Sequence, residues 1–179
     1  MRLSRLLPVL TLALAGAVQA ADCGALLRQH LAGDMALSFD AFDQDDHQGW
    51  RPLGEAGCEA EAAALIEAYA ARQAHPPQVL TWHRAQMLAK AGKTADAIAA
   101  ARLTLRADVD DSGFDWNDYA NATIAFLQGD KAALQDNRDR LAAAVAKSEF
   151  NQPNLRSTDR LLRCFGQPYK VAYDCPAKP

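Results

Sequence analysis

The sequence lacks the features that mark most enzymes, membrane proteins and nucleic-acid-binding proteins. It contains no G-x-S-x-G, H-E-x-x-H or glycine-rich phosphate-binding motif, and its histidines are scattered. After residue 20, no apolar stretch is long enough to cross a bilayer. Lys and Arg form no run in a chain whose formal net charge is −3, whereas phosphate binding needs clustered basic residues. These absences predict no catalytic residue, no cofactor, no nucleic-acid partner and no stable membrane insertion of the mature chain.

The first twenty residues resemble an export signal in their composition. Arg2 and Arg5 form a short basic region, residues 6–18 form an apolar run, and small residues precede the expected cleavage site after Ala20. The apolar run is too short to span a bilayer comfortably. We expect a periplasmic or secreted mature chain of residues 21–179, with an uncleaved N-terminal anchor as the alternative.

Four cysteines follow the expected signal: Cys23, Cys58, Cys164 and Cys175. An even number of cysteines in an exported protein favours disulfides. The sequence allows several connectivities, and we favour Cys23 with Cys58 and Cys164 with Cys175 because each pair flanks a segment with little repeat character. Closing the longer loop, of about 35 residues, would contribute on the order of 3 to 4 kcal/mol. A zinc site is the alternative, although the cysteines lack the close spacing usual in such sites, so we predict no metal.

Helical periodicity dominates the mature sequence, and runs of β-branched residues are nearly absent. We expect helices over residues 22–33, 59–73, 77–92, 94–106 and 154–165, and a helical hairpin over 116–145. Residues 34–57 interrupt this pattern, because aromatic residues there lie among Asp, Gly and Pro, and they predict an ordered loop. The tail from residue 169 to residue 179 would be loose without the second disulfide. We therefore predict a single all-α domain over 21–179, with no sheet of three or more strands.

Two segments are weakly similar helical hairpins, each turning at a glycine followed by a polar residue. The first, residues 80–105, turns at Gly92, and the second, residues 116–145, turns at Gly129. Small residues such as Ala85 allow the two backbones of a hairpin to approach closely, and larger apolar residues fill the space toward the next hairpin.

This pattern resembles the tetratricopeptide repeat. In the first hairpin Ala85 and Ala97 stand where the repeat requires small residues, whereas Leu134 replaces the expected small residue in the second. The resemblance implies stacked antiparallel helical hairpins, a scaffold that binds partners and seldom catalyses. Residues 115–127 also resemble a segment of small uncharacterised exported bacterial proteins, a similarity that implies no activity.

The starts of the two hairpins carry the candidate partner-binding residues Trp82, His83, Trp116 and Tyr119. Parallel stacking would bring these helix starts together as an aromatic and imidazole cluster suited to a peptide or a small ring. If they line a groove, Trp82 or Trp116 should be partly exposed. Ordinary packing between helices is the alternative, because Trp and Tyr are large enough to be core residues without any ligand.

Two acidic segments offer oxygen atoms of the kind that calcium prefers. The first segment contains Asp40, Asp43, Asp45, Asp46 and His47, and the second contains Asp108, Asp110, Ser112 and Gly113. Neither completes an EF-hand: the first lacks the required Gly and distal Glu, and the second has Tyr119 where a bidentate Glu should close the loop. We favour a solvated acidic loop for the first segment, and capping of the next helix by Asp115 for the second.

These observations support an exported helical scaffold that binds a protein or peptide partner in the cell envelope. The alternative is a small hydrolase or metal-dependent enzyme that uses the loop Asp43–His47 together with His83. Convergence of His47 and His83 in one pocket would favour the enzyme. A purely structural subunit of an envelope assembly is a third possibility.

Overall fold

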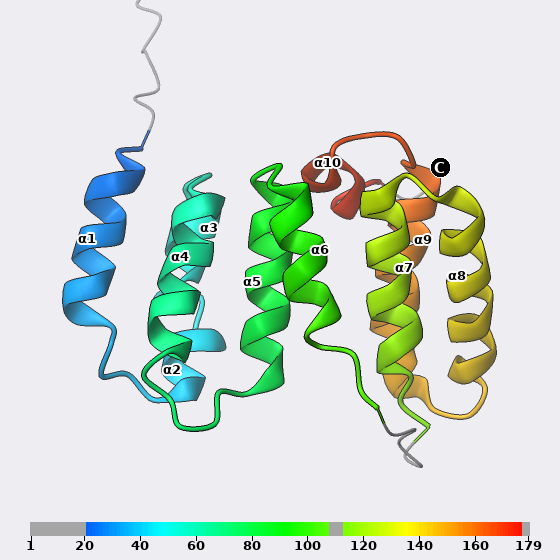
Figure 1. The fold of residues 1–179 in the computed structure, drawn as a ribbon, viewed down its shortest axis with the longest axis horizontal. Coiled ribbons are helices and arrows are strands. Elements are labelled where there is room, and N and C mark those ends of the chain that lie inside the picture. Colours follow the sequence, from blue (N-terminus) through cyan, green and yellow to red (C-terminus); the bar gives the residue numbers. More distant parts are fainter. Residues whose placement is uncertain (1–20, 108–112, 177–179) are drawn as a thin grey trace, which may run out of the picture.

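The computed structural model describes residues 21–107 and 113–176, and this part of the chain is helical without any β-strand (Figure 1). The expected signal peptide lies outside the described residues, as does most of the calcium-loop-like segment at 108–113. The helices are α1 (Cys23–Gly33), α2 (Phe39–Asp43), α3 (Arg51–Glu55), α4 (Glu59–Ala70), α5 (Gln78–Lys90), α6 (Thr94–Arg102), α7 (Trp116–Gln128), α8 (Lys131–Val145), the 3₁₀ turn η1 (Glu149–Asn151), α9 (Gln152–Arg163) and α10 (Tyr169–Tyr173). The all-α prediction is confirmed.

The long helices stand side by side in a row, with α1 at one end and α8 at the other (Figure 1). Helix α5 packs against α4 and α6, α7 packs against α8, and α9 lies against both α7 and α8. The short helix α10 contacts α9 and α5. Buried side chains from α2 to α10 form one continuous hydrophobic core, and α1 packs against it through partly buried residues.

Side-chain caps and left-handed glycines set the helix ends. Asp22, Asp115 and Asp130 each accept a hydrogen bond from a backbone N–H in the first turn of the helix that follows, at 2.9 to 3.0 Å. The predicted capping role of Asp115 is therefore confirmed. Gly92 and Gly129 both have φ of +74°, the conformation that ends a helix most easily at glycine, so both predicted turns are present.

The expected loop over 34–57 contains two short helices, which corrects that part of the sequence analysis. Ser38 caps α2 through a 3.3 Å hydrogen bond from the N–H of Ala41, and a proline lies in the first turn of α3. Phe42 and Leu53 have no exposed surface, so both helices are fixed by the core. Each has five residues, too few for helical periodicity to be visible in the sequence.

Two disulfides join cysteines that are 35 and 11 residues apart along the chain. Cys23 at the start of α1 is bonded to Cys58 before α4, and Cys164 at the end of α9 is bonded to Cys175 after α10. This is the connectivity favoured from the sequence. Within the described residues, no helix is both long and apolar enough to cross a membrane.

Candidate functional site

Three of the four predicted partner-binding residues meet between α5 and α7. The Trp82 ring lies 5.0 Å from the rings of both Trp116 and Tyr119, measured between centroids. Trp82 is only 3% exposed and Tyr119 only 4%, whereas Trp116 is partly exposed. The indole N–H of Trp116 donates to the carbonyl oxygen of Thr104 at 2.7 Å. These rings pack the two hairpins together and offer a ligand little surface beyond Trp116.

His83 lies on a different side of α5 from this cluster. Successive residues of an α-helix are rotated by about 100°, so the neighbour of a buried Trp82 projects elsewhere. The Nδ1 atom of His83 lies 2.7 Å from the Oδ1 atom of Asp43 in α2, and its ring lies 5.2 Å from that of Trp50. With Nδ1–H donating to the carboxylate, Nε2 is the ring nitrogen left to accept a proton or a ligand hydrogen bond.

Asp43 connects α2, α3 and α5. Its carboxylate is fully buried and also accepts hydrogen bonds from the indole N–H of Trp50, at 3.0 Å, and from the side chain of Gln44. The Nε of Arg51 donates to the Asp43 backbone carbonyl at 2.7 Å. Desolvation by burial raises the pKa of Asp43, but the hydrogen bond and charge of His83, the hydrogen bond of Trp50 and the charge of Arg51 together bring it below its ordinary value.

A cleft of about 430 Å³ lies beside the Asp43–His83 pair. Its walls come from three separate segments: Trp50 and the start of α3, His83 and the following turns of α5, and Tyr173 at the end of α10. Lys90 lies 4.7 Å from the centroid of the Tyr173 ring, in a cation–π contact. At another wall, Lys170 forms an ion pair with the mostly buried Glu59.

The floor of the cleft is a polar cluster centred on Gln86. The Gln86 amide nitrogen donates to the hydroxyls of Tyr119, at 3.4 Å, and of Tyr173, at 3.3 Å. The Tyr169 hydroxyl is buried and has no hydrogen-bond partner within the described residues. Burial raises the pKa of both Tyr119 and Tyr169 well above the ordinary value, so both hydroxyls stay protonated. Tyr119, a predicted site residue, therefore lies beneath the cleft and supports its floor.

The acidic loop contributes to the cleft only in part. Asp46 lines the rim, whereas His47 is exposed and is not among the lining residues. The backbone N–H of His47 donates to Asp45 at 2.8 Å, so the loop is organised by its own hydrogen bonds. Within the described residues, the convergence of His47 and His83 that the enzyme hypothesis required is not observed.

The geometry allows acid–base chemistry at His83 but places no hydroxyl of Ser or Thr and no Cys thiol among the described residues that line the cleft. These are the side chains that a histidine base commonly activates. The arrangement is better suited to binding, because charged groups of both signs surround a polar floor. Asp46, Glu55 and Asp174 supply negative charge at this cleft, while Arg51, Lys90 and Lys170 supply positive charge.

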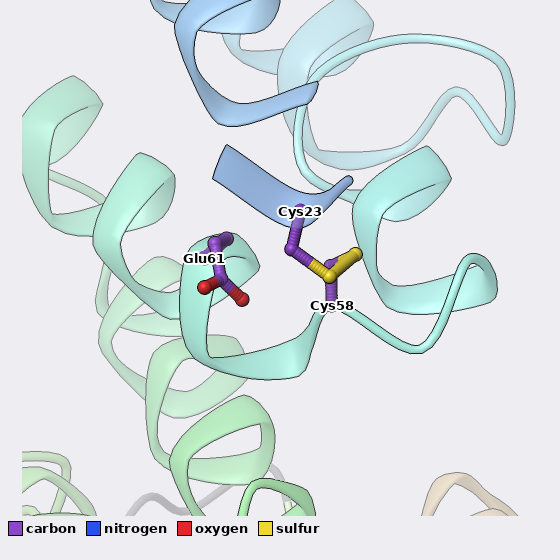
Figure 2. Close-up of side chains that lie close together, drawn as sticks. All are labelled: Cys23, Cys58 and Glu61. Carbon is purple, nitrogen blue, oxygen red and sulfur yellow. A yellow bond between two sulfur atoms is a disulfide. The ribbon is translucent and has the colours of Figure 1, made fainter. Parts of the chain in front are cut away.

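The alternative zinc site involves the first disulfide. Among the described residues, Cys23, Cys58 and Glu61 form the one group of metal-ligating side chains with ligand atoms within 4.8 Å of one another. Figure 2 shows Glu61 beside the bonded sulfur atoms. Zinc is bound by thiolates, and a disulfide has none to offer, so the oxidised chain holds no zinc-binding cysteine pair at this position.

The contribution of α10 to the cleft was not predicted from the sequence. Its signal was present in the spacing of Tyr169, Ala172 and Tyr173, which places apolar groups on one side of a helical turn. Tyr169 and Ala172 are buried, so the tail is held by packing as well as by the disulfide.

Comparison of the chain with family models, curated proteins and solved structures found no match.

Proposed function

We propose that this chain is an exported, tetratricopeptide-like helical scaffold that binds a protein or peptide partner in the cell envelope. The partner occupies the cleft between α3, α5 and α10. The proposal rests on the cleft, where three segments distant along the chain place charged side chains of both signs around the Gln86 amide.

The repeat-like architecture is supported by the two hairpins and their turns. Helices α5 and α6 form one packed pair and α7 and α8 another, each joined at a glycine of positive φ. Ala85 and Ala97 are buried at 4% and 0% exposure, as close approach of two helices requires. Export is supported by the two disulfides, which persist in oxidising compartments.

A peptide suits the cleft better than a purely apolar ligand. A peptide backbone carries both donors and acceptors, and the Gln86 amide, the Tyr173 hydroxyl and the His83 imidazole can match them. Glu55 and Lys90 form no ion pair within the described residues, so each remains able to meet a charged side chain of the partner. Charged groups of this kind select a partner more than they strengthen its binding.

The test is affinity capture from an envelope extract with the mature protein and two variants. The double variant Glu55→Gln/Lys90→Gln removes one charge of each sign from the cleft. The control Lys147→Gln/Glu149→Gln makes the same two changes at exposed positions outside it. We expect one partner to be retained by the wild type and the control and lost by the cleft variant. Retention by all three proteins contradicts the proposed binding site.

Catalysis at His83 is the second candidate function. It is favoured by the 2.7 Å hydrogen bond to a buried Asp43, which orients the imidazole as carboxylates do in hydrolases that use a histidine base. A water molecule would then have to be the nucleophile. Turnover of a captured peptide by the wild type but not by His83→Gln would support this function, whereas stable retention of an intact peptide supports the scaffold.

A further inference from the structure

A second cleft, distinct from the proposed partner site, lies along the outer face of α9. Arg156, Arg160 and Arg163 follow one another at helical spacings of four and three residues, which places them on one face. The opposite face carries Leu155 and Leu161, which are buried in the core. The sequence contains no basic run here, because the three arginines are separated by other residues, so only the helical geometry brings them together.

The three arginines line a cleft of about 480 Å³. Its other wall is the segment Asp174–Pro176, which the Cys164–Cys175 disulfide ties to the end of α9. The second disulfide therefore holds one wall of the cleft in place.

The positive charge of this cleft is only partly compensated by the described residues around it. Within the described residues, Arg156, Arg160 and Arg163 form no ion pair and no side-chain hydrogen bond, whereas the nearby Arg138 donates to Asp159 at 2.7 Å. Asp159 also lines the cleft, but its charge is already engaged by Arg138. Asp174 is the remaining acidic residue of the lining, so positive charge exceeds negative charge in an otherwise acidic chain.

Helix polarity accounts for only part of this arrangement. Arg160 and Arg163 lie in the last turn of α9, where cations interact favourably with the negative end of the helix. Arg156 lies in the first half of the helix, beyond the reach of that effect. The convergence of all three on one cleft instead indicates a ligand that carries negative charge.

We propose that this cleft binds the phosphomonoester group of a small soluble molecule. Each guanidinium presents a planar fork of N–H donors that matches phosphate oxygens, and three of them suit a tetrahedral dianion better than a carboxylate with one charge. The volume of the cleft exceeds that of phosphate alone and lies in the range of small-molecule sites, which leaves room for the body of the ligand. This cleft shares Asp174 with the proposed partner cleft, but none of its three arginines lines that cleft.

The test is a titration of the full mature protein with inorganic phosphate and glycerol 3-phosphate, at constant ionic strength set with chloride. The readout is the NMR signal of each arginine Nε–H group. We expect the signals of Arg156, Arg160 and Arg163 to shift and saturate together, with glycerol 3-phosphate binding at least as tightly as phosphate. The signal of Arg102, an exposed arginine in the last turn of α6, should not move. Equal, non-saturating shifts of all arginines would overturn the proposal.

Variants and vesicles separate this site from general charge effects and from a lipid ligand. Arg160→Gln should weaken glycerol 3-phosphate binding about tenfold, as expected for the loss of charge-assisted hydrogen bonds, whereas the matched control Arg102→Gln should leave it unchanged. Unchanged melting temperatures would show that both variants are folded. Binding to phosphatidylglycerol vesicles without binding to either soluble phosphate would contradict a small-molecule site, as would equal weakening by the two substitutions.

Discussion

Replacement of Asp43 by asparagine tests whether this buried carboxylate holds α2 and α3 against α5. The carboxylate accepts hydrogen bonds from His83, Trp50 and Gln44 and has no exposed surface. Hydrogen bonds to a charged group contribute about 1.5 to 3 kcal/mol each, against about 0.5 to 1.5 kcal/mol for neutral ones. An amide also offers one acceptor oxygen in place of two. We therefore expect Asp43→Asn to lower the free energy of unfolding by about 2 to 4 kcal/mol.

The matched control is Asp40→Asn, which makes the same change on an exposed residue of the same helix. Asp40 lies in the first turn of α2, and its charge contributes at most about 1 kcal/mol through the helix dipole. The assay is urea unfolding at neutral pH, followed by circular dichroism. If the unfolding free energies of the two variants differ by less than about 0.5 kcal/mol, the Asp43 carboxylate does not hold α2 and α3 against α5.

The stability difference between the wild type and Asp43→Asn should depend on pH, in a direction set by the lowered pKa of Asp43. The pKa of Asp43 is lower in the folded protein than in the unfolded chain, so its contribution to stability is fully present above the unfolded-state pKa. That contribution is lost as the pH falls through the folded-state pKa. The stability difference between wild type and Asp43→Asn should therefore stay constant from neutral pH down to about 5 and shrink below about 4. A difference that grows on acidification would contradict this sign.

Three further substitutions test the packing of the repeat-like region and the tail. Trp116→Ala should lower the free energy of unfolding by about 3 to 5 kcal/mol, because the Trp116 ring packs on Trp82. It should leave partner capture intact. A stable variant that no longer binds the partner would show that the partner binds at the aromatic cluster. Replacing Cys164 and Cys175 by serine should cost about 3 kcal/mol, measured by the same unfolding assay, and no stability change would show that α10 is held by packing alone. Gly129→Ala should cost about 1 to 2 kcal/mol because φ is +74°, and a neutral effect on the melting temperature would rule out the left-handed turn.

The long helices and their turns were predictable because their signals are local. Gly92 and Gly129 lie at the points where the apolar periodicity of α5 and α7 stops, and both have the positive φ of a helix end. Asp115 caps α7 through its own side chain. The sequence left several disulfide connectivities open, and the one favoured from the position of the cysteines relative to the repeat-like segments is the one observed. The helices α2 and α3 could not be predicted in this way, because each has only five residues, too few to show a helical period. Burial of Phe42 and Leu53 in the core stabilises them instead.

The cleft was harder to predict than the helices because it depends on three-dimensional convergence. Trp82 and His83 are adjacent in the sequence, yet one enters the core and the other contacts Asp43, since a helix separates neighbours by about 100°. From the sequence, both residues were expected in one cluster. The contact of Lys90 with Tyr173 was not predictable, because it depends on the path of the chain after α9.

Hydrogen exchange of the captured complex would show directly whether the partner occupies the cleft between α3, α5 and α10. The backbone amides of the mature protein would be compared with and without the partner by mass spectrometry. With the partner bound in this cleft, we expect slower exchange in three separate segments that line it, at residues 50–55, 83–90 and 170–174. Slower exchange confined to the start of α7, around Trp116, with none in α3 or α10, would contradict the account and place the partner at the aromatic cluster.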